Sequence, residues 1–407
     1  MSLRFPALSL PMIAPYTGVF AHGMGQSMFV ATLPPLGRSI GLQEVQIGTM
    51  VSLSALIFFL FSRLWGGVSD RHGRKVVIMI GLAGYSLGTL VLTILIDLGM
   101  RGILVGSMLY WLLVVTRMGQ AVVMSGTGPG TAAYIADVTT SEQRTAGMGR
   151  IAAANNIGSI LGPALAGLLA GVALLLPMLF AAAITGIATW LVWKHVPATK
   201  PVASTSERKK LLGYLDPRIR GLLGLSVIVF TALSVVYQTL AFRLQDLFEL
   251  TPAATAVRFG YLLMTSAATS LLTQILIVQR MNLSPMRLLR IGTPLFLVAM
   301  LLLLSATNNL FFELAMIFMG CGLGMAGPGL SAASSLAVSP SEQGAVAGMT
   351  TAMPAMGFVA GPLLGTALYQ LNPTYPYAIT AAILVVATVL AYQINPGTHS
   401  EESVTPQ

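Results

Sequence analysis

The chain has 407 residues, of which 55% are hydrophobic and only 9% are charged, and its mean hydropathy is +0.81. About 25% of the residues of a soluble globular domain are charged, so this composition excludes an ordinary soluble enzyme or binding domain. The formal net charge of +9 would suggest nucleic acid as the partner of a soluble protein, but here the cations are those of loops that fix membrane topology.

The apolar runs predict an all-α membrane protein with twelve transmembrane helices. A spanning helix needs roughly 20 apolar residues, and the chain holds twelve such runs joined by short connections. The first run contains Pro, His and Gln, and we interpret it as a retained helix, not a cleaved signal. The predicted helices cover 11–35, 46–66, 76–97, 103–136, 146–170, 174–193, 221–242, 257–279, 286–306, 309–337, 344–369 and 376–394.

Between the second and third predicted helices, residues 66–75 read G-G-V-S-D-R-H-G-R-K, which predicts a tight cytoplasmic loop rich in glycine and cations. This pattern resembles the signature loop between helices 2 and 3 of the major facilitator superfamily. The resemblance implies a gate at the cytoplasmic side, closed by Asp70 and Arg74 with Asp137 as partner. The matching loop of the second half, 279–290, lacks the Asp and the glycines, so the gate is expected in the first half alone. The predicted gating residues are Gly66, Asp70, Arg71, Gly73, Arg74, Lys75 and Asp137.

Arg117 lies inside the fourth predicted helix, where a guanidinium is costly and usually faces a cavity. The segment from Arg117 to Ala121 resembles the R-x-x-Q-G motif of that helix in the superfamily, with Ala121 in place of glycine, and the motif implies a part in proton transfer. A structural tie to neighbouring carbonyls is the other interpretation. His22 is equally open, as a proton carrier or a packing residue. The predicted substrate and proton cavity contains Arg117, His22, Gln26, Gln120, Asn155, Tyr237 and Gln238.

The fifth predicted helix contains Gly158, Gly162, Pro163 and Gly167, in the order G-x-x-x-G-P-x-x-x-G. Small residues let helices approach closely, so generic packing is one interpretation. The order also resembles the motif that marks antiporters in the superfamily, with Ala166 where the family often has glycine. The resemblance favours an exporter.

The two halves of the chain repeat. T-G-P-G at 127–130, S-E-Q at 141–143, A-G-M at 146–148 and L-G-P at 161–163 are matched, in the same order, by A-G-P-G at 326–329, S-E-Q at 341–343, A-G-M at 347–349 and A-G-P at 360–362. Such a repeat predicts two pseudo-symmetric six-helix bundles with a site between them, the major facilitator fold. The predicted division is an N-terminal bundle 1–193, a cytoplasmic linker 194–220, a C-terminal bundle 221–394 and a cytoplasmic tail 395–407.

The cations predict the orientation. With a cytoplasmic N-terminus, Arg38, Arg101, Arg243 and Arg258 fall outside, Arg117 falls within the membrane, and all the other Lys and Arg residues fall inside. By the positive-inside rule both termini are cytoplasmic. We therefore expect a multi-pass protein of the bacterial inner membrane.

The resemblance points to the drug:proton antiporter branch, tetracycline-efflux-like, and implies proton-coupled efflux of a small organic solute by alternating access. All 13 Asp and Glu residues lie at predicted helix ends, in loops or in tails, which favours a neutral or anionic solute such as a carboxylate-bearing metabolite or siderophore. A proton-coupled importer is the alternative. A membrane enzyme or receptor is a third class, but the loops hold no catalytic cluster.

The energy source is expected to be the proton gradient, because the chain has no Walker-type nucleotide loop. A lone cysteine, Cys321, rules out a disulfide framework, and no metal site or other cofactor is expected. We expect the lipid bilayer, the solute and protons as the partners of a monomer, and no nucleic acid.

Overall fold

A computed structural model describes residues 10–198, 213–339 and 342–394, and nearly all of these residues are helical. The first six membrane segments consist of α1 (Leu10–Ser39), α2 (Glu44–His72), α3 (Arg74–Met100), α4 (Gly106–Met124), α5 (Thr127–Val138), α6 (Ser141–Val172) and α7 (Leu176–His195). The later ones consist of α8 (Arg220–Phe248), α9 (Pro252–Thr273), the π-helix η1 (Gln274–Val278), α10 (Pro285–Leu304), α11 (Asn309–Leu336), α12 (Gln343–Leu371) and α13 (Tyr375–Gln393).

These helices supply the twelve predicted membrane segments. Within the described residues, 11 segments are long and apolar enough to cross a membrane, with α4 and α5 forming one segment and α9 and η1 another. The twelfth is α1, whose 30 residues exceed the roughly 20 that a span requires, although Pro15, Pro34, Pro35, His22 and Gln26 make it less apolar. The prediction of an all-α, twelve-helix fold is confirmed.

Two predicted helices are interrupted. The helix expected over 103–136 divides into α4 and α5 around Ser125 and Gly126. Pro129 has no backbone N–H to give the carbonyl of Ser125, four residues earlier, so the helical ladder loses a hydrogen bond there. The helix expected over 257–279 ends instead in the five-residue π-helix η1.

The expected loop over residues 66–75 is wrong as secondary structure. Helix α2 continues to His72, α3 begins at Arg74, and Gly73 alone separates them. Gly73 has φ = 92° and ψ = 148°, a backbone conformation that glycine adopts at low cost and other residues resist. One glycine is therefore enough to reverse the chain.

The chain divides into two compact units, one of Met1–Thr205 with Leu244–Tyr261 and the other of Ser206–Arg243 with Leu262–Gln407. In the first unit α1 packs against α6 and α7, and α3 packs against α4, α5 and α7. In the second unit α10 packs against α11 and α13, and α12 packs against both of these helices. The division at the predicted linker, 194–220, stays a prediction.

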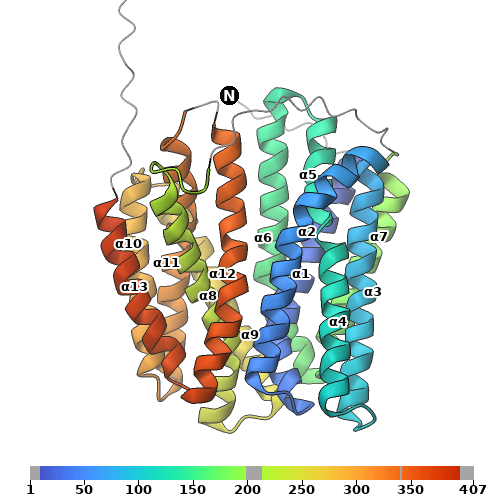
Figure 1. Cartoon of the computed structure of the whole chain (residues 1–407), viewed down its shortest axis with the longest axis vertical. Coiled ribbons are helices and arrows are strands. Elements are labelled where there is room, and N and C mark those ends of the chain that lie inside the picture. Colours follow the sequence, from blue (N-terminus) through green and yellow to red (C-terminus); the bar gives the residue numbers. More distant parts are fainter. Residues whose placement is uncertain (1–9, 199–212, 340–341, 395–407) are drawn as a thin grey trace, which may run out of the picture. The chain divides into compact units, whose positions relative to one another are not determined.

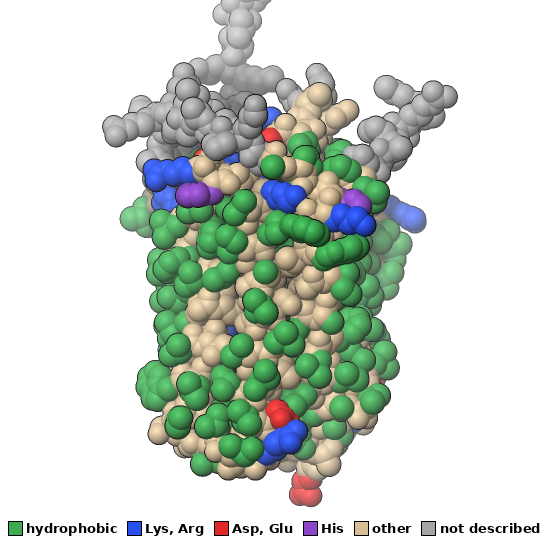
Figure 2. Space-filling view, turned by 90° about the vertical axis from the view of Figure 1, so that its right-hand side faces the viewer, with side chains coloured by type: hydrophobic (Ala, Val, Ile, Leu, Met, Phe, Trp, Pro, Cys, Tyr) green, Lys and Arg blue, Asp and Glu red, His purple; other side chains and the backbone are tan. Residues whose placement is uncertain are grey.

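The outward faces of the helices are apolar, as lipid requires. On α3 and α4 the exposed fractions reach 63% for Leu87, 60% for Trp111 and 65% for Val115. Figure 2 shows hydrophobic side chains along the face that it draws, with most of the visible Lys, Arg and His side chains near one end and a basic side chain beside an acidic one near the other. Such a surface would drive aggregation in water, and in a bilayer it is solvated by acyl chains.

Candidate functional site

Arg117 lies on α4 and is buried inside the first unit, with 4% of its surface exposed. Its Nη1 donates to Oε1 of Gln120 at 2.5 Å, and its Nη2 donates to Oε1 of Gln26, on α1, at 3.1 Å. The ring of Phe29, also on α1, covers the guanidinium, with its centroid 4.1 Å from Cζ. The cation thus joins α4 to α1 through the amide oxygen of Gln26 and the ring of Phe29, while the amide oxygen of Gln120 holds it within α4. Arg117, Gln26, Gln120 and Phe29, with their neighbours His22 and Tyr85, are called the Arg117 cluster below.

The side chain of Gln120 is fixed by α3. Its Nε2 donates to the backbone carbonyl of Tyr85 at 2.9 Å and to Oγ1 of Thr89 at 2.8 Å. Because both of these contacts need the amide nitrogen, the amide oxygen has to point at the guanidinium. A β-carbon on Gly88 would lie 2.7 Å from Cγ of Gln120, so glycine at this position gives the amide its room.

Two further polar groups of the cluster face each other. His22 of α1 and Tyr85 of α3 make an edge-to-face ring contact, with their centroids 5.2 Å apart. Within the described residues Nδ1 of His22, the hydroxyl of Tyr85 and Nε of Arg117 are buried without a hydrogen-bond partner. Buried polar atoms normally have partners, so three such atoms in one cluster indicate a place where a ligand or water binds.

The charge of Arg117 is not balanced by any carboxylate in the described part of the chain. The ion pairs of the described residues all lie elsewhere, and the neighbours of this guanidinium are neutral. An arginine near the bilayer centre costs at least roughly 2.5 kcal/mol on insertion scales, and a buried charge without a counter-ion is rare. The cluster is therefore a desolvated positive centre.

The other predicted cavity residues are spread over both units. Asn155 is exposed on α6 of the first unit. In the second unit, on α8, Tyr237 makes an edge-to-face contact with Phe358, and Gln238 is 3% exposed, with an Nε2 that has no partner in the described residues. The structure thus brings Arg117, His22, Gln26 and Gln120 together, and a cavity shared with the other three stays a prediction.

The predicted gating residues meet at Arg74, the first residue of α3. Its Nε donates to Oδ2 of Asp137, on α5, at 2.9 Å, and its Nη1 donates to Oδ1 of Asp70, on α2. The Arg74 side chain is 10% exposed, against 37% for Asp70 and 35% for Asp137. These three residues, called the Arg74 cluster, tie together the ends of three helices.

The remaining gating residues differ in their surroundings. Nζ of Lys75 donates to the backbone carbonyl of Trp193, on α7, at 2.7 Å, whereas Arg71 is exposed. A β-carbon on Gly66 would meet nothing within 4 Å, so close packing gives no reason for glycine there. A gating function for the whole set stays a prediction.

Two glycines of the predicted antiporter motif, Gly158 and Gly162, pack α6 onto α1. A β-carbon on Gly158 would lie 2.3 Å from the backbone oxygen of Phe20, and one on Gly162 would lie 2.6 Å from that of Met24. Pro163 follows Gly162 directly in α6, and a β-carbon on Gly167 would lie 3.1 Å from the backbone oxygen of Val257, on α9. Helices α6 and α1 therefore touch backbone to backbone, next to the stretch of α1 that carries His22 and Gln26.

Gly158→Ala is expected to destabilise the protein by about 1–3 kcal/mol, because the methyl group has to push two backbones apart. Gly149→Ala, in the same helix, is the control, since a β-carbon there meets nothing within 4 Å. Alanine at position 149 should stabilise by about 0.5–1 kcal/mol through its better helix propensity. Thermal unfolding of the detergent-purified variants measures both effects, and equal midpoints would contradict the packing argument.

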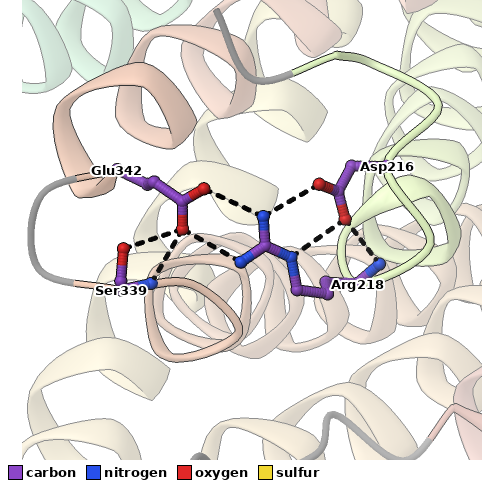
Figure 3. A network of polar contacts seen from close by, with 4 residues as sticks. All are labelled: Asp216, Arg218, Ser339 and Glu342. Atoms are coloured by element: carbon purple, nitrogen blue, oxygen red, sulfur yellow. Dashed lines mark hydrogen bonds and ion pairs between the residues drawn. The ribbon is translucent and has the colours of Figure 1, made fainter. Parts of the chain in front are cut away.

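Sequence analysis missed an ion-pair cluster in the second unit, formed by Asp216, Arg218, Ser339 and Glu342 (Figure 3). Arg218 donates through Nη1 and Nη2 to the two carboxylate oxygens of Glu342, each at 2.9 Å, and through Nη2 to Oδ2 of Asp216 at 2.9 Å. Glu342 also accepts from the hydroxyl of Ser339 at 2.8 Å. This cluster lies outside the loop 279–290, so the prediction of a gate in the first half alone stays a prediction. The only available signal was Glu342 in the repeated S-E-Q.

The cluster of Asp216, Arg218, Ser339 and Glu342, called the Arg218 cluster, predicts how the stability of the protein depends on pH. Hydrogen bonds from Arg218 lower the pKa of Asp216 from 3.8 to about 2, and hydrogen bonds from Arg218 and Ser339 lower that of Glu342 from 4.5 to about 2. A carboxyl group whose pKa is lower in the folded than in the unfolded protein stabilises the fold at every pH above its unfolded-state pKa. This contribution is lost as the pH falls toward 2. The difference in unfolding midpoint between wild type and Arg218→Ala should be full at pH 7 and shrink below about pH 4. A difference that grows on acidification would contradict this assignment.

Comparison with known proteins places the chain among transporters. The family model described as the Major Facilitator Superfamily matches residues 16–353. Multidrug resistance protein 2 of Bacillus subtilis (strain 168) is 26% identical over 384 residues, which cover 91% of each chain. The class G tetracycline resistance protein of Vibrio anguillarum is 29% identical over 370 residues, 85% of this chain and 87% of that protein.

The fold has solved relatives as well. The crystal structure of a bacterial homolog of the human lysosomal transporter Spinster, inward-facing and occupied, superposes with a TM-score of 0.72 at 16% identity. The match covers 94% of this chain and 95% of that one. At this identity the likeness concerns the fold alone.

Proposed function

The chain belongs to the Major Facilitator Superfamily, and from this premise we propose that it exports a small organic solute across the bacterial inner membrane in exchange for protons. The observation that carries the proposal is similarity along nearly the whole chain to resistance proteins for tetracycline and for multiple drugs. The close packing of α6 on α1 at Gly158 and Gly162 is consistent with the antiporter motif that the sequence resembles. Both termini would lie in the cytoplasm, and the monomer would be the working unit.

The proposed mechanism is alternating access driven by the proton gradient, with no cofactor. The Arg117 cluster would form the polar centre of the transport pathway, because it holds a buried cation that no carboxylate of the described residues pairs with, and three buried polar atoms without partners in those residues. The Arg74 cluster would hold the ends of α2, α3 and α5 together while the cytoplasmic side is closed, and would separate when that side opens.

Everted membrane vesicles test the direction of transport. Respiration makes the interior of such vesicles acidic, so an antiporter should accumulate solute inside and lose it when a protonophore is added. The probes are tetracycline, ethidium and carboxyfluorescein, with vesicles from cells lacking the protein as the control. No protein-dependent accumulation of any probe would count against export. Accumulation only when the exterior is made acidic would support the importer instead.

A further inference from the structure

The guanidinium of Arg117 is hydrogen-bonded within the protein through Nη1, whereas its Nε and Nη2 edge is only partly bonded. Nη1 is held by Gln120, whose amide is in turn fixed by the Tyr85 carbonyl and the Thr89 hydroxyl. Nε has no partner in the described residues, and Nη2 is bonded only to Gln26. Nε and Nη2 lie on the same side of a guanidinium, where two parallel N–H groups match the two oxygens of a carboxylate.

Gln26 is the weak internal ligand of Nη2, one of the two nitrogens of this edge. Its side chain is half-buried and makes one hydrogen bond in the described part of the chain, the 3.1 Å contact with Nη2. A neutral amide oxygen binds a guanidinium less strongly than a carboxylate does, and it engages one N–H where a carboxylate engages two. A carboxylate that reaches the cluster would therefore displace Gln26 and gain the unpartnered Nε.

The surroundings favour an anion over a neutral group. Nothing in the described residues neutralises Arg117, so a bound carboxylate would supply the counter-charge that a buried cation lacks. His22 and Tyr85, whose buried Nδ1 and hydroxyl lack partners, can meet further polar groups of the same ligand. The Phe29 ring covers a face of the guanidinium, with its centroid 4.1 Å from Cζ, whereas the two N–H groups of the edge point in the plane of the group.

We propose that the Nε and Nη2 edge of Arg117 binds the carboxylate of the transported solute, which takes the place of the Gln26 amide oxygen. This inference rests on the proposed function and narrows its substrate class to carboxylate-bearing molecules. Gln26 is then an internal competitor that bonds Nη2 while the site is empty, and the cluster selects the solute by its charge and by the bidentate geometry of its carboxylate.

Calorimetric titration of the purified full-length protein with benzoate, at pH 7 and constant ionic strength set with chloride, tests the proposal. Benzamide is the matched neutral probe. Benzoate should bind with a single saturable phase, whereas benzamide and added chloride should not bind. Arg117→Gln should weaken benzoate binding about 30-fold or more, since it removes the charged partner of a buried pair.

Two variants of Gln26 separate this proposal from a purely structural role for the cluster. Gln26→Ala removes the internal ligand and should tighten benzoate binding about tenfold, the worth of one hydrogen bond to a charged group. Gln26→Glu places a permanent carboxylate at the same spot and should abolish benzoate binding while the protein remains folded. Equal binding of benzoate and benzamide, equal binding of chloride, or unchanged binding in Gln26→Glu would each overturn the proposal.

The outcomes distinguish this proposal from the proposed function. Benzoate binding that follows the predicted pattern, in a protein that moves no solute in response to a pH gradient, would keep the carboxylate site and overturn antiport. Proton-driven export of ethidium alone, unaffected by Arg117→Gln, would keep antiport and overturn the carboxylate site.

Discussion

Arg117→Gln is expected to lower transport of a carboxylate-bearing solute about 30-fold or more without unfolding the protein. The loss follows from removing the one buried cation of the cluster, which no carboxylate of the described residues neutralises. Proton-driven uptake into proteoliposomes, normalised to the amount of folded protein, measures it.

The thermal stability of Arg117→Gln should not fall together with its transport rate. Because the buried guanidinium has neutral partners, its replacement removes a desolvation cost, and the unfolding midpoint should stay level or rise. Arg117→Lys is the control that keeps the charge without the planar fork, and its transport should be intermediate. A large drop in midpoint together with wild-type transport per folded molecule would identify Arg117 as a structural tie, the interpretation that the sequence left open.

Arg74→Ala is expected to have the second largest effect, lowering transport about tenfold or more through loss of a closed state. The side chain is nearly buried and bonds Asp70 and Asp137 on two other helices, so its removal leaves two carboxylates facing each other. Both carboxylates are more than a third exposed, and water screens them, so we expect only about 1–2 kcal/mol of lost stability. Hydrogen exchange at the ends of α2, α3 and α5 should become faster.

Arg71→Ala is the matched control, because Arg71 is an exposed cation three residues earlier in the chain. It should change neither exchange nor transport appreciably. A double-mutant cycle of Arg74→Ala with Asp137→Ala should show a coupling energy of about 0.5–3 kcal/mol. Additive effects, or an Arg71 variant as impaired as the Arg74 variant, would contradict a specific ion-pair gate.

The membrane segments were predictable because lipid imposes a simple rule, roughly 20 apolar residues per crossing. Even α1, with His22 and Gln26, could be placed from its length and its neighbours. The requirement of roughly 20 apolar residues does not predict where a helix is interrupted. T-G-P-G at 127–130 begins α5 directly after the break at Ser125 and Gly126, whereas the matching A-G-P-G at 326–329 lies inside the continuous helix α11. Tertiary packing decides between these two outcomes, and it cannot be predicted from the local sequence.

The residue types of the candidate site were predictable, but their connections were not. Arg117 was predicted as a site residue because it is a cation in an apolar segment, and Gln120 because it completes the R-x-x-Q motif. The bond from Arg117 to Gln26 joins positions 91 residues apart, and the contact of Arg218 with Glu342 joins positions 124 residues apart. Both depend on which helices pack together. Likewise Gly73 alone makes the turn that the sequence assigned to ten residues, because α2 continues to His72 and α3 begins at Arg74.

The most direct test follows protons and solute in the same proteoliposomes. With pyranine trapped inside and an acidic interior, addition of a carboxylate solute should make the interior more alkaline as the solute accumulates. We expect this coupled exchange for the wild-type protein and its loss in Arg117→Gln. Solute accumulation with no change in internal pH, or alkalinisation as fast in Arg117→Gln as in wild type, would contradict it.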